Sequence, residues 1–78
     1  MLPPERRVNY MLDLSTAYTK TGHYEEAAHT LVEAERIAPE EVRCRPLAHG
    51  LLRAMLRNTR GELGRSVQWI ASRAGLTI

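Results

Sequence analysis

The sequence predicts an all-α domain built from antiparallel helical hairpins, about four helices in all. Ala and Leu dominate its apolar residues and Phe is absent, a composition typical of helical proteins. Apolar residues recur at three- and four-residue steps in successive stretches of the chain. Glycine or proline separates these stretches by only a few residues, and such short connections force neighbouring helices to run antiparallel.

We expect the first helix to run from Arg6 or Arg7 to about Thr21, after a frayed segment over residues 1–5 that contains two prolines. The residues that share its predicted buried face are Met11, Leu14, Ser15 and Tyr18. Gly22 should end this helix, because glycine adopts the left-handed conformation of a helix C-terminus without steric cost.

A second helix is predicted from about Tyr24 to Ala38, and Pro39 should end it. Its apolar side consists of Tyr24, Ala27, Ala28, Leu31, Ala34 and Ala38. Residues 40–45 are compatible with one helical turn or with a loop, since Pro46 disfavours the α conformation at Arg45.

Two further helices follow, from about Pro46 to Asn58 and from about Glu62 to Ala74, with Gly75 as the C-terminal glycine of the last one. Their predicted apolar faces are Leu47, Ala48, Leu51, Leu52 and Met55, then Leu63, Val67, Ile70, Ala71 and Ala74. Trp69 lies just off the second of these faces, where it either half-buries or offers a contact. Residues 76–78 are expected to leave the body.

The composition also limits the compartment and the chemistry. No apolar run reaches the roughly 20 residues of a membrane span, the opening residues lack the apolar core of a signal peptide, and a single cysteine, Cys44, cannot form an internal disulfide. We therefore expect a soluble, cytoplasmic protein that does not bind membranes. No pattern indicates a catalytic site, a metal site or a cofactor site, so we expect no enzyme activity.

Charge is distributed unevenly between the two halves. Residues 1–40 carry four basic and seven acidic side chains, whereas residues 41–78 carry seven arginines and two glutamates. A basic half can attract nucleic acid or an acidic protein surface, although arginines are also common on solvated helix faces. The candidate basic patch comprises Arg45, His49, Arg53, Arg57 and Arg60.

The first hairpin resembles a tetratricopeptide (TPR) repeat, a helix-turn-helix unit of about 34 residues. The positions of the repeat motif are occupied, in order, by Met11, Leu14, Ser15, Tyr18, Gly22, Tyr24, Ala27, Leu31, Ala34 and Pro39. Met11 stands for the usual Trp, Ser15 for a Gly and Leu31 for an aromatic residue. The resemblance implies a TPR-like right-handed superhelix in one domain over residues 6–78, with a good repeat at 6–39 and a degenerate second hairpin at 40–78.

The run from Arg7 through PEEVRCRP and the closing WIASRAGL are also similar to the C-terminal half of bacterial Xre-type helix-turn-helix regulators, which carry a TPR-like sensor domain. In that family the DNA-binding domain precedes this region, so DNA binding is not expected from this chain alone. The resemblance implies a regulatory or oligomerising helical domain.

These resemblances imply a binding domain for a protein, a peptide or a second copy of the chain. In TPR repeats the first helix lines a concave groove, which maps to Asn9, Leu12, Asp13, Thr16, Thr19 and Lys20. Solenoids need at least about three repeats, so an open end should be covered by something else. A two-fold dimer is one solution, and its candidate face is Val67, Trp69 and Ile70.

Overall fold

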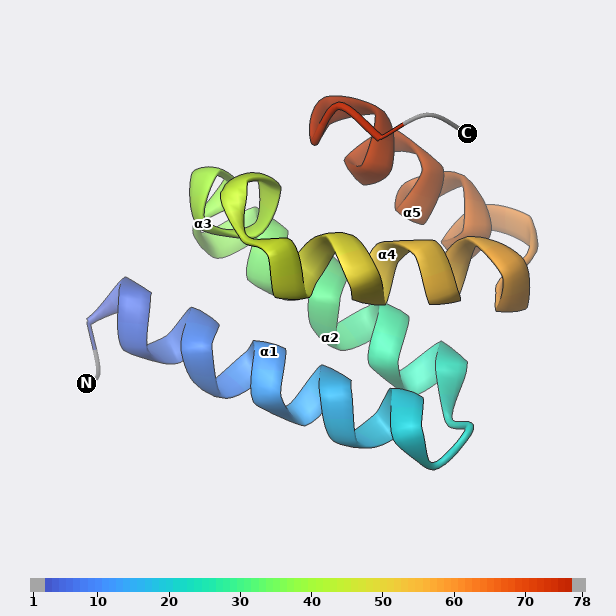
Figure 1. The fold of residues 1–78 in the computed structure, drawn as a ribbon, viewed down its shortest axis with the longest axis horizontal. Helices are drawn as coiled ribbons and strands as arrows, with labels where there is room; N and C mark the ends of the chain where they lie inside the picture. Colours follow the sequence, from blue (N-terminus) through green and yellow to red (C-terminus); the bar gives the residue numbers. More distant parts are fainter. Residues whose placement is uncertain (1–2, 77–78) are drawn as a thin grey trace.

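The computed structural model describes residues 3–76, which form five α-helices that run back and forth (Figure 1). The prediction of an all-α domain with packed helix pairs is therefore confirmed, whereas the expected number of about four helices is one too few. The helices are α1 (Pro4–Lys20), α2 (Tyr24–Ile37), α3 (Pro39–Cys44), α4 (Pro46–Asn58) and α5 (Gly61–Arg73).

Helix α1 begins at Pro4, two or three residues before the expected start at Arg6 or Arg7. Proline suits this first helical position, because its missing N–H would have no partner inside the helix there. Pro4 and Glu5 consequently belong to α1 and not to a frayed segment. Residues 1–2 of the predicted frayed segment lie outside the described residues.

The turn between α1 and α2 has the glycine that the sequence predicted. Gly22 has a φ of 79°, and two hydrogen bonds close the helix end around it. The His23 N–H donates to the Tyr18 carbonyl at 2.8 Å and the Gly22 N–H to the Thr19 carbonyl at 3.2 Å, the pattern of a Schellman motif. This compact end turns the chain directly into α2.

The same motif ends α5 at Gly75, which has a φ of 82°. The Leu76 N–H donates to the Ala71 carbonyl at 3.0 Å, and the Leu76 side chain packs against the core. The expectation that residues 76–78 leave the body is wrong for Leu76, since the Schellman motif folds it back onto its own helix. Residues 77–78 lie outside the described part of the chain.

Residues 40–45, which the sequence left open, form most of the short helix α3. Pro39 ends α2 and at the same time occupies the first position of α3. Arg45 is extended, with a φ of −90° and a ψ of 127°, as expected for a residue that precedes a proline. The Val42 side chain of α3 is fully buried, so α3 contributes to the core.

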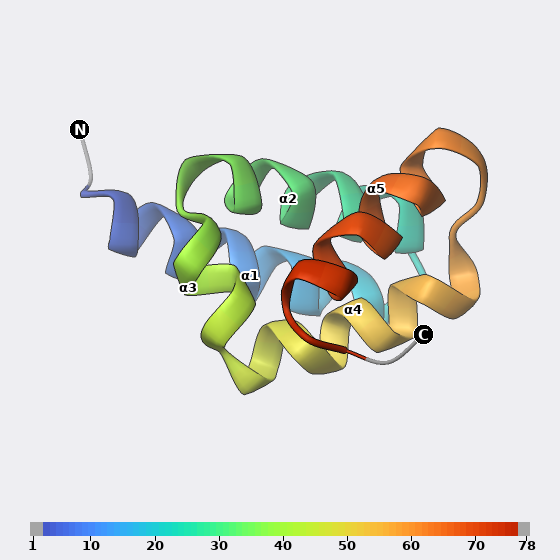
Figure 2. The same ribbon diagram turned by 90° about the horizontal axis from the view of Figure 1, so that it is seen from above.

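The core lies where α2, α3 and α4 meet the two outer helices. Each of these three helices contacts every other helix, whereas α1 and α5 do not touch each other within residues 3–76. Figure 1 shows α4 between α1 below and α5 above, and Figure 2 shows α2 at the top of the molecule and α4 at the bottom. The buried hydrophobic residues are Val8, Leu12, Ala27, Ala28, Leu31, Ala34, Val42, Ala48, Leu51, Leu52, Met55, Val67, Ile70 and Ala71.

The buried face of α1 is rotated relative to the predicted one. It is centred on Val8, Leu12 and Ser15, while Met11 and Tyr18 are only half-buried. The reason is that α1 packs against α4 as well as α2, which draws the flank carrying Leu12 inward. The Ser15 hydroxyl donates to the Ala27 carbonyl of α2 at 2.9 Å. On α4 the predicted core residue Leu47 is instead 46% exposed.

Within the part of the chain that the structure describes, no helix combines the length and the apolar composition needed to cross a membrane.

Candidate binding groove between α2 and α5

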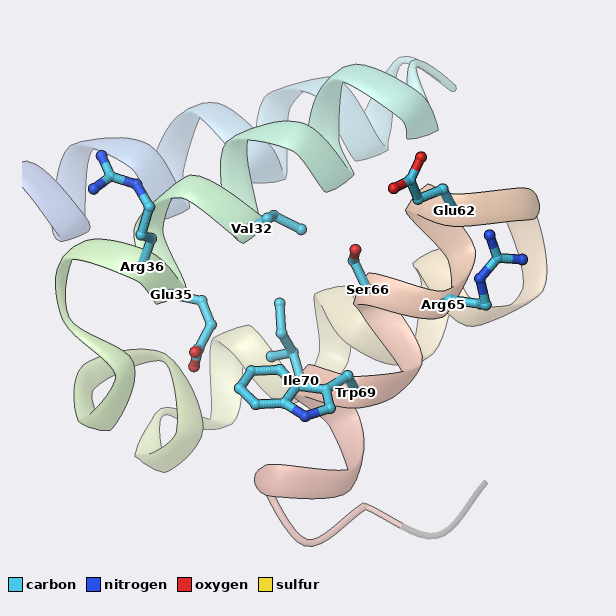
Figure 3. A pocket seen from close by; sticks show the side chains of 8 residues that line it. All are labelled: Val32, Glu35, Arg36, Glu62, Arg65, Ser66, Trp69 and Ile70. Atoms are coloured by element: carbon cyan, nitrogen blue, oxygen red, sulfur yellow. The ribbon is translucent and has the colours of Figure 1, made fainter.

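An open hollow of about 520 Å³ lies between α2 and α5 (Figure 3). Both helices supply side chains to it, because they pack side by side along part of their length. We call this hollow the α2–α5 groove. It is lined by Val32, Glu35 and Arg36 from α2 and by Glu62, Arg65, Ser66, Trp69 and Ile70 from α5.

The floor of the groove is apolar. Ile70 is only 2% exposed and belongs to the core, and Val32 is half-buried beside it. Trp69 directly precedes Ile70 in α5. Its side chain lies beside the buried face of the helix and is 54% exposed. Figure 3 shows its indole at the mouth of the groove, next to Ile70. The groove therefore presents a large aromatic surface to a ligand.

Two arginines flank the indole of Trp69. The guanidinium carbon of Arg43 lies 5.7 Å from the ring centroid, and that of Arg73 lies 5.4 Å from it. Both distances fall within the range of cation–π attraction, worth about 0.5–1 kcal/mol at an exposed site. These contacts restrict the indole although it is largely exposed.

Arg43 is itself fixed by the buried carboxylate of Glu35, which is 6% exposed. Its Nε and Nη2 donate to the two carboxylate oxygens at 3.1 Å and 3.2 Å. The paired hydrogen bonds satisfy the buried charge and connect α2 with α3. Glu35 thus positions Arg43 against Trp69 and offers no free charge to the groove.

A second ion pair lies on the α2 rim of the groove, between Arg36 and Glu33. The hydrogen bonds from the Arg36 guanidinium hold the pKa of the Glu33 carboxyl below its ordinary value. The same bonds raise the pKa of Arg36. Because both side chains are exposed, this pair orders the rim more than it stabilises the fold.

The predicted groove on α1 is not reproduced as a whole. Leu12 is 1% exposed and is a core residue, so its assignment to a ligand-binding face is wrong. The hydroxyls of Thr16 and Thr19 donate to the Leu12 and Ser15 carbonyls of their own helix. Asn9, Asp13 and Lys20 are exposed on α1, away from the α2–α5 groove.

The predicted basic patch separates into two parts. Arg45 donates to Glu41 at 2.8–2.9 Å, and His49 donates from Nε2 to the Arg43 carbonyl at 2.6 Å. Both side chains therefore have structural partners at the α3–α4 junction. The other three members of the patch are exposed and form none of the ion pairs found in residues 3–76: Arg53, Arg57 and Arg60.

The predicted dimer face is also divided. Val67 is fully buried and Ile70 is 2% exposed, because α5 uses its single apolar face against its own chain. The assignment of these two residues to a face between copies is therefore wrong. Trp69 alone of the predicted set is exposed and available.

The groove as a unit was not predicted, since its two walls are distant in sequence. A local signal was nevertheless present, because Arg65, Trp69 and Arg73 follow one another at four-residue steps and so share one face of a helix. No group of three or more histidine, cysteine or acidic residues in the described chain could hold a metal ion. Cys44 is exposed and free.

Comparison with known proteins gives no relationship. No family model matches the chain, and neither a curated protein nor a solved structure does.

Proposed function

We propose that this protein is a non-enzymatic helical interaction domain that binds a segment of a partner protein in the α2–α5 groove. The observation that carries the proposal is the position of Trp69, which is 54% exposed beside a hollow with an apolar floor. An exposed Trp next to an apolar hollow is typical of the anchor residues at protein interfaces. The groove is open to solvent, which allows a peptide segment to enter it.

The resemblance of residues 8–39 to a TPR repeat supports this class of function, because helical repeats of that type bind proteins and peptides. We further propose that the domain is the sensor or oligomerisation part of a bacterial transcriptional regulator, which the similarity to Xre-type regulators supports. In that case the domain regulates transcription, and the binding of a partner protein is the signal that it detects.

Two other functions have less support in the geometry. Nucleic-acid binding is less well supported because two of the five residues of the predicted basic patch, Arg45 and His49, already have partners within the fold. Dimerisation through α5 is less well supported because Val67 and Ile70 of the predicted dimer face are buried in the core of the single chain. A peptide site in the groove relies instead on Trp69, which remains 54% exposed.

Selection of a random peptide library on the immobilised protein tests the proposal. We expect enriched peptides that bind the wild type and lose binding to the Trp69→Ala variant. Because Trp69 is the single tryptophan of the chain, the same peptides should shift its fluorescence on titration.

The matched control is Leu47→Ala, which removes another exposed large apolar side chain from a helix outside the groove. It should leave peptide binding unchanged. If no peptide is enriched, or if the enriched peptides bind equally well without Trp69, the groove is not the binding site and the proposed function is wrong.

A further inference from the structure

The charges around the α2–α5 groove define the chemistry of its ligand, and this inference rests on the proposed function. Two acidic side chains near the groove are already paired, Glu35 with Arg43 and Glu33 with Arg36. Of the acidic residues that line it, Glu62 alone forms none of the ion pairs in the described chain.

Two basic side chains remain free on α5. Arg65 lines the groove and Arg73 lies over the indole of Trp69, and neither takes part in an ion pair or a side-chain hydrogen bond within residues 3–76. A guanidinium held over an aromatic ring by cation–π attraction keeps its N–H donors for a second partner. Arg73 is therefore partly ordered before a carboxylate arrives.

The separation of Arg65 and Arg73 predicts how far apart two acidic side chains of the ligand should be. Arg65 and Arg73 lie eight residues apart on one face of α5, about 12 Å along the helix axis at 1.5 Å per residue. Trp69 lies midway between them. In an extended segment, which rises about 3.3 Å per residue, two side chains that reach both arginines are about four residues apart.

We propose that the occupant of the α2–α5 groove is an acidic segment of a partner protein, in which one large apolar side chain lies between two carboxylates. The apolar side chain packs on Val32 and on the exposed part of the Trp69 indole, above the nearly buried Ile70. The carboxylates accept hydrogen bonds from Arg65 and Arg73, and charge-assisted bonds of this kind are stronger than neutral ones.

Peptide-library selection on three proteins tests this proposal. On the wild type we expect enriched peptides with two Asp or Glu residues about four positions apart and a large apolar residue between them. On the double variant Arg65→Glu/Arg73→Glu the acidic positions should change to Lys or Arg. The control variant Arg53→Glu/Arg57→Glu loses the same charge from α4, outside the groove, and should select the same acidic peptides as the wild type.

A selected wild-type peptide should also bind the Arg65→Glu/Arg73→Glu variant at least about tenfold more weakly, from loss of two charge-assisted bonds. Titration of Trp69 fluorescence measures the affinity, and circular dichroism confirms that each variant remains helical. Arg65→Gln/Arg73→Gln, which is milder for folding, should show a smaller loss in the same direction.

Peptides without an acidic bias, or an acidic bias that survives the charge reversal, would overturn the inference and leave peptide binding in the groove intact. Absence of any peptide that requires Trp69 would instead contradict the proposed function. Duplex DNA that quenches Trp69 fluorescence, with no acidic peptide enriched, would assign the free arginines to nucleic acid and overturn the proposal.

Discussion

Ser15 illustrates how a single polar atom joins two helices of this domain. Its side chain is fully buried, and its hydroxyl donates to the Ala27 carbonyl across the α1–α2 contact. A small residue is required here because the two helices approach each other closely at the alanines of α2. The hydroxyl adds a directional hydrogen bond to that contact, so Ser15 stabilises the packing of α1 on α2.

Replacing Ser15 by alanine should lower the free energy of unfolding by about 1 kcal/mol, the net value of one hydrogen bond. Denaturant unfolding followed by circular dichroism measures the change. Ser72→Ala is the matched control, since Ser72 is exposed on α5. Equal stability of the two variants would show that the Ser15 hydroxyl contributes nothing.

The ion pair between Glu33 and Arg36 predicts a pH effect with a defined sign. Because Arg36 lowers the pKa of the Glu33 carboxyl, the pair stabilises the folded state above the ordinary carboxyl pKa. That contribution is lost as the pH falls through the lowered pKa. The Arg36→Ala variant should therefore raise the pKa of Glu33 toward its ordinary value.

Carbon-13 NMR of the Glu33 side-chain carboxyl across a pH titration measures this pKa. Added salt should shift the wild-type pKa in the same upward direction, because salt screens exposed pairs. Arg57→Ala removes an arginine elsewhere and should leave the pKa of Glu33 where it is. An unchanged pKa in Arg36→Ala would contradict the assignment of Arg36 as the cause.

At the scale of elements, two helical glycines with the same local conformation have different surroundings. Gly50 in α4 has open space where a Cβ would lie. Gly64 in α5 is buried, and a Cβ there would meet the Thr59 carbonyl oxygen at 3.1 Å. The helical periodicity alone does not distinguish them. Gly64 allows the first turn of α5 to pack against the α4–α5 connection.

Gly50→Ala should raise the free energy of unfolding by about 0.5–1 kcal/mol, since alanine favours the helix and meets no neighbour. Gly64→Ala should lower it by about 1 kcal/mol, because the backbone of Thr59 must move to admit the methyl group. Each variant serves as the control for the other in thermal unfolding. If both alanine variants were more stable than the wild type, the α4–α5 connection would have moved to admit the methyl group at position 64 at little cost.

For the molecule as a whole, α2 is the central helix and Leu31 is fully buried within it. A domain of 78 residues has a total stability of roughly 4–12 kcal/mol. Leu31→Ala should cost about 2–5 kcal/mol and so remove a large share of that stability. Leu47→Ala, at a site that is 46% exposed, should cost under about 1 kcal/mol.

Differential scanning calorimetry compares the melting temperatures of these two leucine variants with that of the wild type. We expect one cooperative transition in each, shifted strongly only for Leu31→Ala. Similar shifts for both variants would contradict the packing of α2 at the centre.

Much of the fold could be predicted because helix signals are local. The apolar period of α2 and α5, the stop at Pro39 and the left-handed turn glycines Gly22 and Gly75 each depend on neighbours within a few residues. Helix α3 was the ambiguous case, since Pro39 and Pro46 are compatible with a loop as well as with one helical turn. The helical conformation buries the Val42 side chain in the core, which favours the helix. The neighbouring sequence alone does not indicate that Val42 is buried.

The candidate site was predicted less well, because exposure depends on which helices meet. Leu12 and Ile70 had the right character for a binding face, yet packing by α4 and by α2 places both in the core. The TPR-like arrangement itself stays a prediction.

The sequence by itself determined that this protein is helical, where most of its helices end, and that an arginine, a tryptophan and an arginine share one face of α5. Only the tertiary structure decided that this face borders Val32 and Glu35, which come from a distant part of the chain. The physical reason is that periodicity defines which side of a helix is apolar, whereas packing decides how much of that side is covered. Trp69 is exposed because α2 covers Ile70 and leaves the indole at the edge.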